Sequence, residues 1–188
     1  MSGKIDMFLP QESIEKNVLR QGDIIKNIHL LGAINLNSVH YSVSQSNQEE
    51  YMAWNVPNKP NFGDAMVVSH SCEIERENKV KVTSVILAPI RDVNKATSPE
   101  MLQKLIDSNY IDNESTAASF LKYFYVEPHP ALQYSNGAIV DFSKIFSVRK
   151  QSYNHLLERK VGQLNETASL NMALKLAVYY YRRESLAA

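Results

Sequence analysis

Two side chains that can do chemistry lie close together in one short stretch of the sequence, Ser69-His70-Ser71-Cys72-Glu73. The stretch follows an apolar segment typical of a buried strand, and side chains two positions apart on a strand point to the same side. We therefore expect His70 and Cys72 to share a site, where an imidazolium lowers the pKa of the thiol and makes it a nucleophile. The alternative is a structural pair, because cysteine is among the most often buried residues.

A second candidate site lies in the carboxyl-terminal part of the chain, although the net charge of the whole chain is zero. Residues 1–143 hold 12 Lys or Arg and 17 Asp or Glu, a net charge of −5. Residues 144–188 hold 8 Lys or Arg and 3 Asp or Glu, a net charge of +5. Basic side chains contact phosphates and aromatic rings stack on bases. The predicted nucleic-acid-binding residues are Arg149, Lys150, Tyr153, Arg159 and Lys160. Three alternatives remain: basic residues that only complement the dipole of a terminal helix, head-to-tail pairing of two copies of the chain, or a surface for an acidic protein partner.

The sequence indicates neither a metal site nor a cofactor. Zinc needs three or four ligands at usable spacing, and His29, His40, His129 and His155 are dispersed. A phosphate-binding glycine loop and a dinucleotide fingerprint are both missing from the sequence. No apolar run approaches the ~20 residues of a membrane span, and the lone Cys72 fits a reducing compartment, so we expect a cytoplasmic protein without membrane contact.

The elements that must position these residues are short strands with helices inserted between them and appended after them. This is a mainly β pattern with helices (α+β), without the regular alternation of a doubly wound sheet, and 188 residues suit a single domain. Strands are expected at residues 22–31, 51–56, 65–69, 80–88, 120–126 and 138–148. We expect them to form a small barrel in which Met66, Val68, Val85, Leu87, Ile139, Leu174 and Val178 are mostly buried.

Three helical segments accompany the strands. Residues 1–21 are expected as a helical extension, because Ile14, Val18 and Leu19 have helical spacing. Residues 95–119 are expected as a helical insert, whose helix over 98–107 has Ser98 as its N-cap and Pro99 at its first position. The last helix is expected over 165–182, capped by Asn165. Its apolar face is predicted to be Leu170, Ala173, Leu174, Ala177, Val178 and Tyr181.

Four phrases carry a family resemblance. They are Gln21-Gly22-Asp23-Ile24-Ile25, Ala65-Met66-Val67-Val68-Ser69, Val85-Ile86-Leu87-Ala88-Pro89-Ile90 and the segment 137–148, followed by Val161-Gly162-Gln163-Leu164 before the last helix. In this order they resemble the layout of MazF/PemK-like proteins. The resemblance implies an SH3-like small barrel over residues 1–188 with a C-terminal helix, and a homodimer.

The same resemblance implies a sequence-selective endoribonuclease of a toxin–antitoxin pair that acts without metal. It places an arginine just before the second strand and a Thr or Ser just after the third, where this sequence has Gly63-Asp64 and Arg91. Metal-independent cleavage of RNA needs a base, an acid and positive charge at the phosphate, and Arg91 supplies only the charge.

Two functions therefore stay open. The first is an RNA-acting or single-stranded nucleic-acid-binding protein of a prokaryotic toxin–antitoxin or defence system, with His70, Cys72 and Arg91 as catalytic candidates. The second is a non-catalytic protein-interaction module that keeps the barrel and has lost the ribonuclease residues. An acidic, antitoxin-like protein is a candidate partner in either case.

Overall fold

The computed structural model describes residues 6–29, 40–46, 49–55, 62–76, 79–80, 83–93, 97–111 and 118–186. The chain divides into two compact units, one formed by His29–Phe62 and the other by Met1–Ile28 together with Gly63–Ala188. In the smaller unit, β2 (His40–Ser46) and β3 (Glu49–Asn55) form an antiparallel hairpin with Tyr41 opposite Trp54. The strand expected at residues 51–56 belongs to this hairpin.

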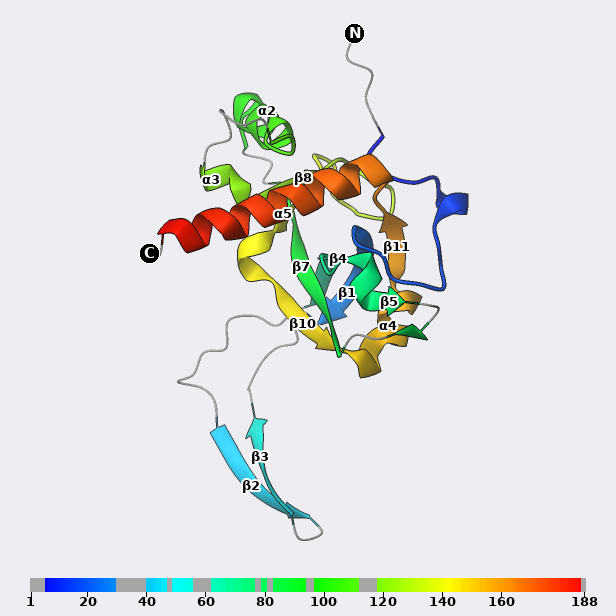
Figure 1. Cartoon of the computed structure of the whole chain (residues 1–188), viewed down its shortest axis with the longest axis vertical. Helices are drawn as coiled ribbons and strands as arrows, with labels where there is room; N and C mark the ends of the chain where they lie inside the picture. Colours follow the sequence, from blue (N-terminus) through cyan, green and yellow to red (C-terminus); the bar gives the residue numbers. More distant parts are fainter. Residues whose placement is uncertain are drawn as a thin grey trace. The chain divides into compact units, whose positions relative to one another are not determined.

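The larger unit is built on a seven-stranded sheet that curls into a half-barrel (Figure 1). Its strands follow the order β11 (Lys160–Gln163), β1 (Asp23–His29), β4 (Phe62–Val67), β7 (Ser84–Asp92), β9 (Ala138–Asp141) and β8 (Tyr123–Val126), and β10 (Phe146–Arg149) pairs with β7. The nine-residue β7 is the central strand, because it pairs with β4, with β10 over its first half and with β9 over its end. The expected α+β class with a mainly antiparallel sheet is confirmed.

Helices and short turns complete the larger unit. The helices are α1 (Ser71–Ile74), α2 (Pro99–Asp107), α3 (Ala118–Leu121), α4 (Tyr153–Glu158) and α5 (Glu166–Leu186). The 3-10 turns are η1 (Gln11–Ser13), η3 (Phe142–Lys144) and η4 (Lys150–Ser152), and β5 (Glu75–Arg76) pairs with β6 (Lys79–Val80) in a small hairpin. No helix in the described ranges is both long and apolar enough to cross a membrane.

The core lies between the sheet and α5. Met66, Val68 and Ala88 of the sheet belong to one buried cluster that includes Ala168 and Met172 of α5. Side chains alternate along a strand, so the buried Val67 and Leu87 lie on the opposite face of the sheet. Of the residues predicted to be buried, Met66, Val68, Val85 and Leu87 are buried and Ile139 and Val178 are half-buried.

Both predicted helix caps are confirmed. The amide of Met101 donates to Ser98 Oγ at 3.3 Å at the start of α2, and Pro99 takes the first helical position. The amide of Ala168 donates to Asn165 Oδ1 at 2.8 Å at the start of α5. These two side chains satisfy amides that have no partner within their own helix, which sets where each helix begins.

The expected helix in the first 21 residues is wrong, because the described part of this segment holds only the turn η1. Its amides bond to distant side chains instead of to a helical backbone. Glu15 N donates to Gln163 Oε1 at 3.4 Å, and Leu19 N donates to Tyr153 Oη at 3.0 Å. The apolar spacing reflects burial in the fold, since Ile14, Val18 and Leu19 are all buried.

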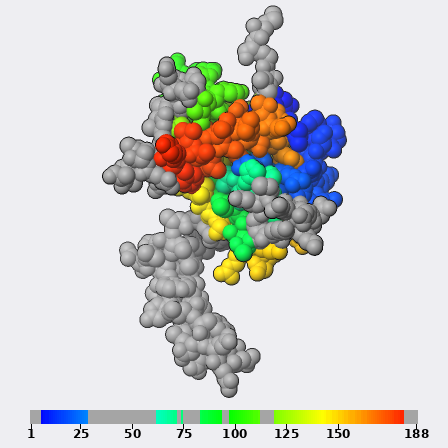
Figure 2. Space-filling model, viewed as in Figure 1, coloured from blue at the N-terminus to red at the C-terminus, as the bar shows by residue number. Residues whose placement is uncertain are grey.

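The buried face of α5 also differs from the prediction. Leu170 and Leu174 are 58% and 51% exposed, while Ala168, Met172 and Lys175 are buried. Figure 2 shows α5 as a ridge across one face of the molecule. Apolar residues occur all round this helix, so their spacing alone does not identify the face that is buried.

Candidate functional site

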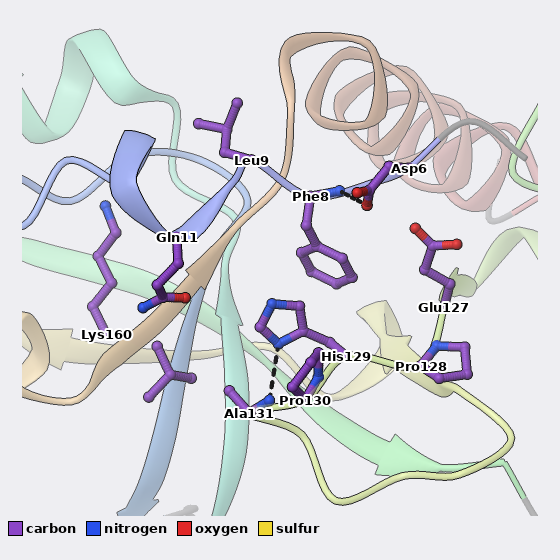
Figure 3. Close-up of a pocket in the computed structure, with 11 residues that line it drawn as sticks. Asp6, Phe8, Leu9, Gln11, Glu127, Pro128, His129, Pro130, Ala131 and Lys160 are labelled. Atoms are coloured by element: carbon purple, nitrogen blue, oxygen red, sulfur yellow. Dashed lines mark hydrogen bonds between the residues drawn. The ribbon is translucent and has the colours of Figure 1, made fainter.

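A hollow of about 1000 Å³ opens beside His129 (Figure 3). We call it the His129 hollow. Its walls come from three separate parts of the chain: the N-terminal segment, the loop after β8, and β11. The lining residues are Asp6, Phe8, Leu9, Gln11, Glu127, Pro128, His129, Pro130, Ala131, Lys160 and Val161.

The N-terminal segment is held against the end of β11 as a short extra strand. Phe8 forms an antiparallel bridge with Leu164, and Leu9 N donates to Gln163 O at 2.9 Å. Asn165, the cap of α5, donates from its backbone amide to Met7 O at 2.9 Å. Sheet-type pairing therefore fixes the wall that carries Phe8.

The second wall is the loop Glu127–Ala131, in which two prolines flank His129. Proline fixes its own backbone angle and restricts the residue before it, so this loop is stiff. The amide of Ala131 donates to His129 Nδ1 at 3.2 Å, which places the proton of the neutral imidazole on Nε2. The His129 ring also packs on the Phe8 ring, with centroids 4.3 Å apart.

Two carboxylates give the hollow its charge. Glu127 Oε1 accepts from Met7 N at 2.6 Å, and Asp6 Oδ1 accepts from Phe8 N at 3.1 Å. Burial lowers the pKa of His129, although Asp6 and Glu127 act in the opposite direction. The imidazole is therefore neutral at pH 7, and the net charge of these three groups is negative.

Lys160 lines the hollow, but its charge is balanced inside the fold. Its Nζ lies 2.7 Å from Asp23 Oδ2 and 2.7 Å from Glu15 O, and both side chains of the ion pair are almost completely buried. Burial raises the pKa of Asp23 to about 7, against the opposing effect of Lys160. Figure 3 shows the Lys160 ammonium turned away from His129.

The expected pairing of His70 with Cys72 rested on strand geometry, and that geometry is wrong here. The chain turns into α1 directly after His70, whose carbonyl accepts from Ile74 N at 3.2 Å. The alternation of a strand therefore does not apply. His70 is exposed, and the Cys72 side chain lies outside the described part of the structure, so its reactivity stays a prediction.

Arg91 lies far from that turn. The turn is anchored at Ile86, whose amide donates to Ser69 Oγ at 2.7 Å, and Arg91 follows five residues later on the same strand β7. At about 3.3 Å per residue, the two places are about 16 Å apart. The structure does not bring His70 and Arg91 together.

The two positions singled out by the family resemblance hold structural contacts. Asp64 is buried, and its carboxylate accepts from Asn27 N at 3.0 Å and from Tyr134 Oη at 3.2 Å. Arg91 forms an ion pair with Asp141 at 3.4 Å.

The five predicted nucleic-acid-binding residues separate into two groups. Tyr153 is buried and its hydroxyl accepts from Leu19 N, and Lys160 is buried in its ion pair with Asp23. Neither can meet a nucleic acid at the surface. Arg149 and Lys150 are exposed at the end of β10, and Arg159 donates to Asn27 O at 2.9 Å at the end of α4.

Phe8, Glu127 and His129 were not expected to belong to one site. They come from distant parts of the chain, and no short motif joins them. The available signal was the run Pro128-His129-Pro130, since a histidine between two prolines is held in a stiff loop. Comparison with models of known protein families and with curated protein sequences finds no match to this chain.

Proposed function

We propose that this chain is a non-catalytic binding module that holds a segment of a partner protein in the His129 hollow. The observation that carries the proposal is the hollow itself: about 1000 Å³, lined by a packed aromatic pair and two carboxylates. Concave sites of this size that combine apolar walls with a few placed polar groups are typical of ligand binding. The finer fold description that we propose is a MazF/PemK-like, SH3-like barrel.

The absence of an assembled catalytic set among the described candidates supports binding over catalysis. The turn before His70 contacts β7 at Ile86, near the start of that strand, whereas Arg91 lies near its end. Asp64 accepts hydrogen bonds from Asn27 and Tyr134. A ribonuclease that works without metal needs its acid, base and cationic group around one phosphate. The hydrogen bonds of Asp64 connect two other segments of the chain, so we assign this side chain a structural role.

Display of random short peptides on phage tests this proposal. The library is selected against the unmodified chain and against Ala131→Trp, which places a large ring inside the hollow. We expect a peptide consensus for the unmodified chain and its loss for the variant, with circular dichroism to verify folding. Gln11→Trp at the exposed rim is the second blocking variant. Equal enrichment on all three proteins, or none, would contradict the proposal.

A second candidate function is binding of single-stranded nucleic acid. It is favoured by the exposure of Arg149 and Lys150, which follow one another at the end of β10, and by Arg159 at the far end of the segment η4–α4. Exposed cations bind phosphate in a weak, salt-dependent way. The homodimer, the acidic antitoxin-like partner and the cytoplasmic location stay predictions.

A further inference from the structure

We propose that the partner segment presents a cationic side chain, arginine or lysine, to Asp6 and Glu127 beside the Phe8 ring. This inference rests on the proposed function and names the chemistry of its ligand. It follows from the charge, the aromatic wall and the stiffness of the hollow.

Each carboxylate has one oxygen engaged and one available. Glu127 Oε1 accepts from Met7 N, and Asp6 Oδ1 accepts from Phe8 N. Within the described residues, Glu127 Oε2 and Asp6 Oδ2 have no hydrogen-bond partner. Figure 3 shows both carboxylates on the same side of the Phe8 ring. A guanidinium carries five N–H donors, enough to bond to two carboxylates.

The charge of the hollow is not cancelled by its own lysine. Lys160 pairs with Asp23 at 2.7 Å, and its side chain is 1% exposed. A cationic ligand therefore meets two carboxylates and a neutral imidazole. An anionic ligand would meet two like charges, which disfavours it.

The walls suit the rest of such a side chain. Phe8 is 6% exposed and lies beneath the ring of His129, so the half-buried imidazole is the accessible aromatic surface on which a guanidinium stacks and an alkyl stem packs. His129 is packed on Phe8, and Pro128 and Pro130 keep the loop stiff. Little conformational freedom is lost on binding, because the site is already ordered.

A bare metal ion is a poorer occupant. Calcium takes six to eight oxygen ligands and zinc takes four. Across the described ranges of the chain, no three His, Cys, Asp or Glu side chains lie close enough together to hold a metal ion. Two carboxylates next to an aromatic ring fit an organic cation.

A peptide array tests the inference with the full chain. Short peptides of random sequence are spotted as matched copies that differ at one position, where arginine, its neutral isostere citrulline, or glutamate stands. We expect arginine copies to bind the unmodified chain about 10-fold more tightly than citrulline copies, the effect of one charge-assisted contact. We expect glutamate copies to bind most weakly.

Matched variants connect this effect to the carboxylates. Glu127→Gln keeps an acceptor for Met7 N and removes only the charge, so it should bring the arginine-to-citrulline ratio close to one. Asp6→Asn is the second variant of the same design. Glu158→Gln, at an exposed glutamate of α4 that does not line the hollow, should leave the ratio unchanged.

The outcomes separate the two proposals. If arginine and citrulline copies bind equally, and both lose binding to Ala131→Trp, the inference is wrong while the proposed function stands. If no peptide distinguishes the unmodified chain from Ala131→Trp, the proposed function fails and the inference fails with it. If free arginine competes for the hollow as well as the unlabelled peptide does, the ligand is a small cation and the proposal of a partner segment is wrong.

Discussion

The ring of Phe8 packs on the ring of His129, with centroids 4.3 Å apart and planes inclined at 49°. This contact joins the N-terminal segment to the loop after β8, and the bridge from Phe8 to Leu164 joins both to the end of β11. Phe8 is 6% exposed, so the residue that shapes the hollow also belongs to the core.

Replacing Phe8 by leucine tests this double role. The smaller side chain leaves a cavity and removes the contact with His129, so we expect a loss of about 1–2 kcal/mol in the free energy of unfolding. Urea denaturation measures it. Tyr110→Leu is the control, since Tyr110 is 54% exposed and its replacement should have little effect. Equal losses in the two variants would contradict the packing role of Phe8.

The buried Lys175 makes a pH-dependent contribution to stability. Its Nζ lies 2.7 Å from Ser108 Oγ at the end of α2, and burial lowers its pKa from 10.5 to about 7. Between these two pH values the unfolded chain binds more protons at this position than the folded chain, so the free energy of unfolding rises with pH.

The variant Lys175→Met isolates that contribution. Ser108 Oγ still donates to Leu105 O, and Asn109 still bonds to Tyr125, so few polar groups lose a partner. We expect the difference in unfolding free energy between the unmodified chain and the variant to move in favour of lysine above pH 7, by at most about 1.4 kcal/mol per pH unit. Denaturation at pH 6 to 10 measures it, and a constant difference would refute the role of Lys175.

Binding of an arginine peptide in the His129 hollow should weaken in acid. The groups that face the cation are Asp6, Glu127 and His129, with the pair of Asp23 and Lys160 behind the wall. Because burial lowers the pKa of His129 below its ordinary value of 6.5, the imidazole is neutral at pH 7. It becomes a repelling cation as the pH falls through that lowered pKa.

Titration calorimetry from pH 8 to pH 5 measures this loss of affinity. Asp23 is protonated in the same range, since burial raises its pKa to about 7, and this leaves the charge of Lys160 unbalanced. His129→Gln should therefore remove only part of the pH dependence. An affinity that does not change with pH in the unmodified chain would argue against a cation next to His129.

The second candidate function predicts a salt-dependent interaction of three basic residues with nucleic acid. Replacing Arg149, Lys150 and Arg159 with glutamate should weaken binding of a fluorescent single-stranded RNA, measured by anisotropy at several salt concentrations. If all three contact phosphate, the slope of log affinity against log salt should fall in magnitude by about 2, at ~0.7 per contact on a single strand. Lys104→Glu, on exposed α2, is the control. No RNA binding at low salt would remove the second candidate function.

Local chemistry explains what the sequence could predict. Ser98 and Asn165 cap helices through bonds to amides three residues away, so their roles are visible in a short window. The buried face of α5 was not predictable in this way. Lys175 is buried with its ammonium donating a hydrogen bond to Ser108 Oγ, 67 positions earlier, and nothing near Lys175 in the sequence shows that contact.

The candidate site could not be predicted from the sequence for the same reason. Phe8, Glu127 and Lys160 become neighbours only through sheet pairing and the path of the loop after β8. The prediction that His70 and Cys72 share one side of a strand was wrong for a local reason. An apolar strand pattern continues into Ser69, and the sequence does not show that the chain becomes helical at Ser71.

The most direct test of the central claim is a nitrogen–proton NMR spectrum of the labelled full chain, recorded with and without the tightest arginine peptide from the array. We predict that the shifted amides gather in three segments, residues 6–11, residues 127–131 and the pair Lys160-Val161, which line the hollow. Shifts that gather around Arg149, Lys150 and Arg159, or an unchanged spectrum at saturating peptide, would contradict the account.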